Sequence, residues 1–137
     1  MLNFLAAFTT SAAAAAAFRG PLRAVWASGL TGLLGYITYE LARALHAPQV
    51  LAAFVGALTI GAAGELLARY LRQPTLLFIV PGLFPLAPGF MAYTGMLELA
   101  RGQVASAGHE LTQTMFYAGS LAAGLALPPA LLRRNRG

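Results

Sequence analysis

The sequence predicts an all-α membrane protein, a polytopic bundle of about five helical spans of which one is discontinuous. Of its 137 residues, 58% are hydrophobic and 9% are charged, whereas a soluble domain carries about 25% charged residues. Apolar stretches of roughly helix length alternate with short turns that contain proline, glycine or arginine. One apolar stretch holds three prolines and two Pro-Gly pairs within residues 81–89, which predicts the discontinuity. We therefore expect a single integral membrane domain over residues 1–137.

The first expected span, residues 2–18, is rich in alanine. A cleaved signal peptide is the alternative interpretation, because Ala-x-Ala patterns occur within residues 12–17. Signal peptides carry positive charge before their apolar core, whereas Arg19 and Arg23 follow this one. We favour a retained helix.

The second span, residues 22–45, and the third, residues 48–71, both contain small residues at helical spacing. In the second, Gly29, Gly32 and Gly35 recur every three residues, which predicts a groove for close approach by another helix. In the third, a seam of small residues spaced by four leads into an acidic and then a basic side chain; its members are Ala53, Ala57, Gly61, Glu65 and Arg69.

The fourth span, residues 74–99, contains the break, and the fifth covers residues 110–132. In the fifth, we expect Gly119, Ala123 and Leu127 to form a packing edge. The Pro128-Pro129 pair is expected to disturb the end of that helix.

Arginines set the expected orientation. Five spans place two arginines on one side of the membrane, Arg43 and Arg101, and seven on the other. Arginine bias in short loops marks the cytoplasmic side, so we expect the amino terminus outside and the carboxyl terminus in the cytoplasm. The seven are Arg19, Arg23, Arg69, Arg72, Arg133, Arg134 and Arg136.

The break is the expected binding site. Proline removes a backbone donor, and unsatisfied backbone groups in hydrocarbon cost several kcal/mol each, so residues 81–89 should be broken backbone that faces a protein-lined cavity. A second half-helix starting near Phe90 would present free N–H groups to a carboxylate, with hydroxyl contacts from Tyr93 and Thr94. Carbonyls freed within residues 79–84 could accept from an ammonium or hydroxyl group, or coordinate a cation. A proline-kinked helix without a ligand is the alternative.

Two carboxylates in the spans could pair or titrate. Glu40 has Arg43 three residues on, and Glu65 has Arg69 four residues on. Intramembrane carboxylates often couple protons or bind cationic ligands, but structural ion pairing is favoured for both, and Glu65 is the better candidate for a ligand-lining role.

The sequence lacks the residues that several classes of enzyme need. The chain has no aspartate, cysteine or lysine, which excludes thiolate sites, cysteine nucleophiles and a lysine-ended phosphate loop. His46 and His109 lack metal-binding spacing, and we expect them exposed at helix ends. No enzyme activity, cofactor or metal is expected. Nucleic acid is not an expected partner either, because the arginines behind the net charge of +5 are scattered between apolar spans.

Three segments carry a resemblance: Pro21-Leu-Arg-Ala-Val-Trp26, Arg69-Tyr-Leu-Arg-Gln-Pro74 and Val80-Pro-Gly-Leu-Phe-Pro-Leu-Ala-Pro-Gly89, followed by Tyr93 and Met96. They resemble the carboxyl-terminal half of the threonine/serine exporter family, in particular the separately encoded small subunit found in bacterial succinate exporters. The resemblance implies a multi-pass protein of the bacterial inner membrane that exports small carboxylates, such as serine, threonine or dicarboxylates, along with a larger subunit. The motif positions of the family in this sequence are Pro81, Gly82, Pro85, Pro88, Gly89 and Tyr93. Their role in ligand binding is a prediction.

Three hypotheses follow. The first is a transport subunit whose site is the broken helix. The second is a non-transporting membrane scaffold that binds a partner through its two small-residue seams, and the third is a homo-oligomeric channel. Five spans offer few ways to build two access states, so we expect a larger membrane subunit or further copies of this chain as partners, besides membrane lipid.

Overall fold

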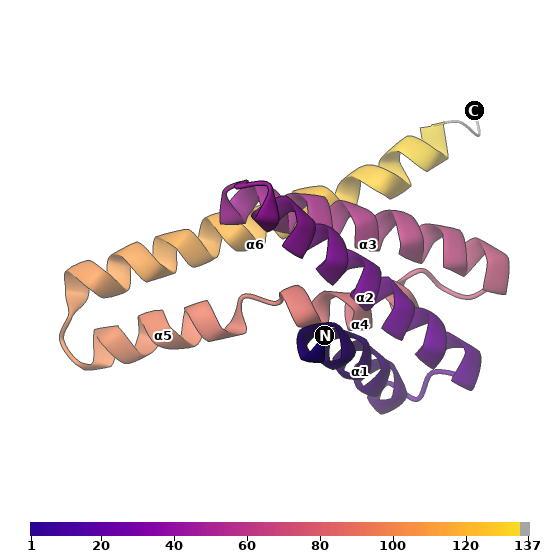
Figure 1. Cartoon of the computed structure of the whole chain (residues 1–137), viewed down its shortest axis with the longest axis horizontal. Helices are drawn as coiled ribbons and strands as arrows, with labels where there is room; N and C mark the ends of the chain where they lie inside the picture. Colours follow the sequence, from indigo (N-terminus) through magenta and orange to yellow (C-terminus); the bar gives the residue numbers. More distant parts are fainter. Residues whose placement is uncertain (135–137) are drawn as a thin grey trace.

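The computed structural model describes residues 1–134, and over these residues it contains helices and no strands, so the all-α prediction is confirmed. Arg136, one of the seven arginines above, lies outside the described residues. In chain order the elements are α1 (Leu2–Ala17), α2 (Leu22–Ala44), α3 (Gln49–Leu71), α4 (Leu76–Leu83), the short 3₁₀ helix η1 (Phe84–Leu86), α5 (Gly89–Ala100) and α6 (Val104–Arg134) (Figure 1).

Two helices within residues 1–134, α3 and α6, are long and apolar enough to cross a membrane. The α4–η1 segment and α5 make a third span if they are counted together, with a bend of 51° between them. With 16 residues, α1 is shorter than a typical span, and the polar and charged residues of α2 lower its hydropathy. The number of five spans therefore stays a prediction.

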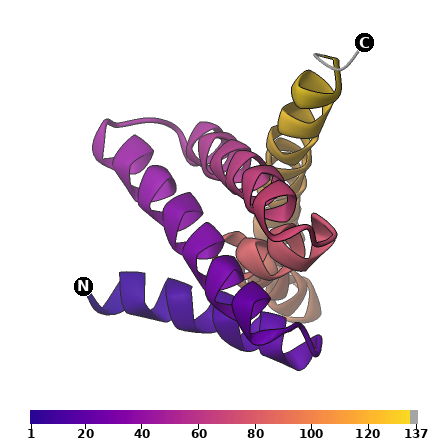
Figure 2. The ribbon, with the colours of Figure 1, turned by 90° about the vertical axis from the view of Figure 1, so that its right-hand side faces the viewer.

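Helices α3, α5 and α6 run along the long axis of the molecule, whereas α1 is seen nearly end-on in Figure 1. The α1–α2 and α3–α4 connections and the end of α6 lie on one side, and the α2–α3 and α5–α6 connections lie on the other (Figure 1). In Figure 2, α1 and α2 diverge from their shared turn, and α6 lies behind α3. The short α4 packs against α1, α2 and α3, whereas the backbone of α5 packs only against α6 among the described helices.

The glycines of α2 accommodate side chains of two other helices of this chain, α1 and α3. An added Cβ would lie 2.8 Å from the Phe8 ring of α1 at Gly29, would overlap the Ser11 hydroxyl of α1 at Gly32, and would overlap Ile60 of α3 at Gly35. The expected groove therefore exists, and its occupants come from within the chain.

The buried face of α6 differs from the expected packing edge. Gly119, Ala123 and Leu127 are exposed, so that prediction is wrong. The buried residues instead include Tyr117, Leu121, Gly124 and Pro128, because Gly124, which has no side chain, lets α6 approach the α3 backbone closely. A Cβ there would be 2.6 Å from the Phe54 carbonyl oxygen.

The ends of α6 also differ from expectation. The helix runs through Pro128 and Pro129 to Arg134. The Pro128 ring packs into the space left by Gly61, 2.9 Å from where a Cβ would stand. It begins at Val104 rather than near residue 110, since the chain turns at Gly102, whose φ is 78°. His109 consequently lies inside the helix and not at its end.

Candidate functional site

The discontinuity in the fourth apolar stretch is present but narrower than expected. Helical geometry continues through Pro81 in α4 and then through η1. The chain is extended only at Ala87, with φ −61° and ψ 133°, and a new helix begins at Gly89. The expected second half-helix near Phe90 is thus confirmed, whereas broken backbone from residue 81 onward is wrong.

Ser28 explains why the helix survives Pro81. In an α-helix the N–H of residue 81 would bond to the carbonyl of Leu77, four residues earlier, and proline has no N–H. The buried Ser28 hydroxyl of α2 donates to the Leu77 carbonyl oxygen at 2.8 Å and takes the place of that bond.

Other backbone carbonyls of the break are also satisfied inside the chain. The N–H of Phe84 donates to the Pro81 carbonyl, and the N–H of Ala87 donates to the Phe84 carbonyl at 3.3 Å. The carbonyls of residues 77, 81 and 84 therefore have partners without any ligand, which corrects the expectation for residues 79–84 in part.

The motif residues fall into an inner and an outer group. Pro81 and Gly82 are buried, and a Cβ at Gly82 would lie 3.2 Å from both Thr31 and Ile60. These two positions therefore pack α4 against α2 and α3. Pro85 and Pro88 are half-buried between the two groups.

The outer group is the first turn of α5. Gly89 is exposed, and no heavy atom lies within 4 Å of a Cβ added to it. Phe90 is 81% exposed and Tyr93 is 63% exposed. Thr94 donates its hydroxyl to the Phe90 carbonyl at 2.8 Å within the same helix. In the isolated chain, this turn faces outward rather than into an internal cavity.

Two hollows border the inner part of the break. One, of about 390 Å³, is apolar, lies between α1, α2 and α4, and ends at Val80 and Pro81. The other, of about 270 Å³, lies between α1 and η1, where Phe84 and Pro85 face Asn3, Thr10 and Tyr36. Both hollows thus lie beside the segment that precedes the break, and the second hollow offers polar groups.

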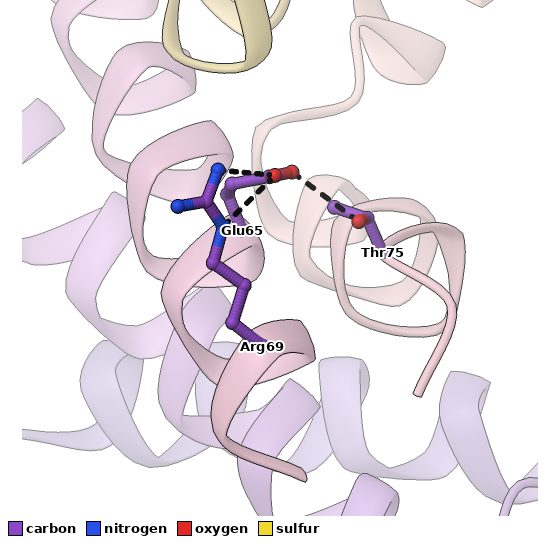
Figure 3. Close-up of polar contacts among 3 residues, drawn as sticks. All are labelled: Glu65, Arg69 and Thr75. Atoms are coloured by element: carbon purple, nitrogen blue, oxygen red, sulfur yellow. Dashed lines mark hydrogen bonds and ion pairs between the residues drawn. The ribbon is translucent and has the colours of Figure 1, made fainter. Parts of the chain in front are cut away.

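Glu65 connects α3 to the start of α4. Its carboxylate accepts from the Arg69 guanidinium, with N–O distances of 3.2 and 3.4 Å, and from the Thr75 hydroxyl at 3.3 Å (Figure 3). The Glu65 side chain is 13% exposed. The ion pair favoured by the sequence therefore forms, and the carboxylate additionally fixes the residue that precedes α4.

Glu40 behaves differently. Within residues 1–134, the Glu65–Arg69 pair is the one ion pair present, so the expected Glu40–Arg43 pairing is wrong. Arg43 instead donates to the Ala47 carbonyl at 3.2 Å, because the chain reverses just after α2, at His46 with φ 65°. Glu40 stays half-buried on α2.

A polar cleft that the sequence interpretation missed lies beside α5. It has a volume of about 650 Å³, and its lining includes Gln49, Met91, His109, Glu110 and Gln113. The spacing of the last three residues would have indicated one face of a helix. The signal was lost because the helix was expected to begin only at residue 110.

A family model described as "Threonine/Serine exporter, ThrE" matches residues 3–131. The chain is 36% identical over 126 residues to a protein named "Threonine/serine exporter" from Corynebacterium glutamicum, in a match that covers 89% of this chain and 26% of that protein. It is 30% identical over 128 residues to an uncharacterized protein of Haemophilus influenzae, covering 87% of this chain and 43% of that protein. The chain thus spans less than half the length of either relative. No solved structure matches it.

Proposed function

Because this chain belongs to the threonine/serine exporter family, we propose that it forms one part of an inner-membrane exporter of small carboxylates whose substrate passes the α4–α5 break. The observation that carries this proposal is the outward-facing first turn of α5. Its start at Gly89 has no side-chain cap, and a helix start of this kind attracts carboxylates.

A second protein part completes the site in this proposal. Phe90 and Tyr93 are exposed in the isolated chain, and the curated relatives are more than twice as long as the stretch that matches. A larger membrane subunit or a second copy that covers the first turn of α5 would enclose the substrate. Binding sites built on half-helices in this way recur among secondary transporters.

A small hydroxy amino acid is the substrate class that would use both the start of α5 and the cleft beside α5. Dicarboxylates such as succinate are the alternative. The cleft beside α5 contains the half-buried Glu110, which has no ion-pair partner within residues 1–134. A free carboxylate in a polar cleft suits the ammonium group of an amino acid. The helix start would take the carboxylate of either class.

The membrane orientation is part of the proposal. The arginine-rich connections, which hold Arg19, Arg23, Arg69 and Arg72, would face the cytoplasm of a bacterial cell, following the arginine bias. The amino terminus would be outside and the carboxyl terminus inside.

The scaffold alternative requires that the two small-residue seams be free to bind a partner, and they are not. Ala53 and Ala57 are fully buried, and Gly29, Gly32 and Gly35 contact helices of the same chain. These seams are therefore not free to bind a partner. A homo-oligomeric channel predicts ion conductance in liposomes that contain this chain alone, and an exporter that needs a second part predicts none.

Gly89→Leu tests the transport proposal. The new side chain meets no heavy atom of this chain within 4 Å of its Cβ, so folding should be retained while the start of α5 is blocked. We expect at least a tenfold loss of serine, threonine and succinate efflux from cells that carry the complete exporter. Gly119→Leu is the matched control, because Gly119 is an equally open helical glycine on α6. Unchanged efflux from Gly89→Leu at normal protein levels would refute a substrate path at the break.

A further inference from the structure

Two arginines from distant parts of the chain meet in one pocket at the arginine-rich end. Arg23, in the first turn of α2, and Arg72, directly after α3, both line a pocket of about 360 Å³. Tyr70 and Gln73 add polar groups to the same lining. The sequence interpretation used these arginines only to orient the chain.

The positive charge in this pocket is not compensated inside the protein. Within residues 1–134, neither Arg23 nor Arg72 forms an ion pair or donates a side-chain hydrogen bond, since the guanidinium contacts found there belong to Arg43 and Arg69. Glu65, the acid nearest in sequence to Arg72, is already held by Arg69. The pocket therefore offers two free guanidinium groups, which suits a phosphate or a carboxylate.

An apolar groove continues from the mouth of this pocket. The groove has a volume of about 540 Å³, and Arg23, Tyr70 and Leu71 line both hollows. Beyond them it is lined mainly by Trp26 and Leu30 of α2 and Leu67 of α3. From Arg23 to Leu30 it follows α2 for about 10 Å at 1.5 Å per residue, away from the charged end.

The shape and chemistry match one class of ligand. We infer that the pocket and groove together bind an anionic phospholipid, with its headgroup phosphate between Arg23 and Arg72 and an acyl chain along Trp26 and Leu30. Basic pockets between membrane helices on the cytoplasmic side bind anionic headgroups, and the exposed aromatic rings of Trp26 and Tyr70 suit the level of the headgroups. A free metabolite would use the guanidinium groups but not the groove. This inference does not depend on which substrate is transported.

The conformation of Arg72 supplies a well-matched test. Arg72 has φ 51° and Arg19 has φ 55°, a left-handed conformation that favours glycine and that closes α3 and α1 respectively. Glycine at either position should preserve the fold while it removes one positive charge from the same end of the molecule. Arg19 does not line the pocket or the groove, so Arg19→Gly is the control for Arg72→Gly.

The experiment measures lipid binding by native mass spectrometry of the full chain in neutral detergent. Phosphatidylglycerol, phosphatidylcholine, glycerol 3-phosphate and succinate are titrated against wild type, Arg72→Gly, Arg23→Gln and Arg19→Gly. Wild type and Arg19→Gly should prefer phosphatidylglycerol over phosphatidylcholine. Arg72→Gly and Arg23→Gln should each bind phosphatidylglycerol about fivefold more weakly, which corresponds to about 1 kcal/mol per arginine.

Three results would overturn the inference. Equal binding of phosphatidylglycerol and phosphatidylcholine by wild type would show that the charge of the headgroup does not select the lipid. An equal loss in Arg19→Gly and Arg72→Gly would indicate general surface charge rather than a pocket. Binding of glycerol 3-phosphate or succinate as tightly as phosphatidylglycerol would show a small-anion site that makes no use of the groove.

Discussion

The hydrogen bond between Ser28 and the Leu77 carbonyl makes a sharp prediction about how α4 tolerates Pro81. Ser28→Ala removes the hydroxyl that donates to the Leu77 carbonyl. No backbone N–H can replace it, because residue 81 is a proline. An unsatisfied buried carbonyl costs about 1–3 kcal/mol, and hydrogen bonds between membrane helices average about 0.6 kcal/mol with a maximum near 1.7. We therefore expect Ser28→Ala to lower the free energy of unfolding by about 1 kcal/mol.

The same substitution should cost little once Pro81 is replaced. Pro81→Ala restores an N–H that can bond to the Leu77 carbonyl within α4, so the Ser28 hydroxyl becomes redundant. In the Pro81→Ala background, Ser28→Ala should cost at most about 0.3 kcal/mol, which gives a coupling energy near 0.7 kcal/mol in a double-mutant cycle. The cycle cancels the cavity that the lost proline ring leaves.

Reversible unfolding in mixed detergent micelles, followed by circular dichroism, measures all four proteins of the cycle. Thr31→Val is the control, because the Thr31 hydroxyl donates to the Ala27 carbonyl within its own helix at 2.8 Å and should show no coupling to Pro81. Equal costs of Ser28→Ala with and without Pro81 would refute the idea that this serine replaces the missing donor.

Three further predictions concern the packing and the two carboxylates. Gly124→Ala should lower the free energy of unfolding by about 1–3 kcal/mol, since its Cβ would stand 2.6 Å from the Phe54 carbonyl oxygen. Gly119→Ala, in open space, should raise the free energy of unfolding by up to about 1 kcal/mol. Equal free energies of unfolding for the two variants would contradict the α3–α6 contact. Glu65→Gln should lower the unfolding energy by at most about 1 kcal/mol and leave efflux intact, whereas lost efflux at normal stability would assign it a proton-coupling role. Glu110→Gln should reduce serine efflux about tenfold relative to succinate, from a charged hydrogen bond of 1.5–3 kcal/mol, and equal effects on both substrates would reject an ammonium contact.

The helices and their break could be read from the sequence alone. Low charge and apolar stretches between turns predict membrane helices, and two Pro-Gly pairs predict a discontinuity within residues 81–89, because these properties are local to the chain. Only the second pair, Pro88-Gly89, lies at the observed break, since the helix continues through Pro81 and Gly82. The ion pair of Glu65 and Arg69 is local as well, since four residues separate its partners on one helix. The likeness to the exporter family likewise rests on short segments of sequence.

The tertiary structure decided which face of each helix is buried and which residues meet across helices. The spacing of Gly119 and Ala123 favours a packing edge that the structure leaves exposed. In lipid both faces of a helix are apolar, so hydropathy does not distinguish the packed face from the exposed one. Ser28 and Leu77 are 49 residues apart, and so are Arg23 and Arg72 in number. Such contacts between helices depend on how closely two backbones can approach. Close approach is possible at Gly32, Gly35 and Gly124 because these residues have no side chain.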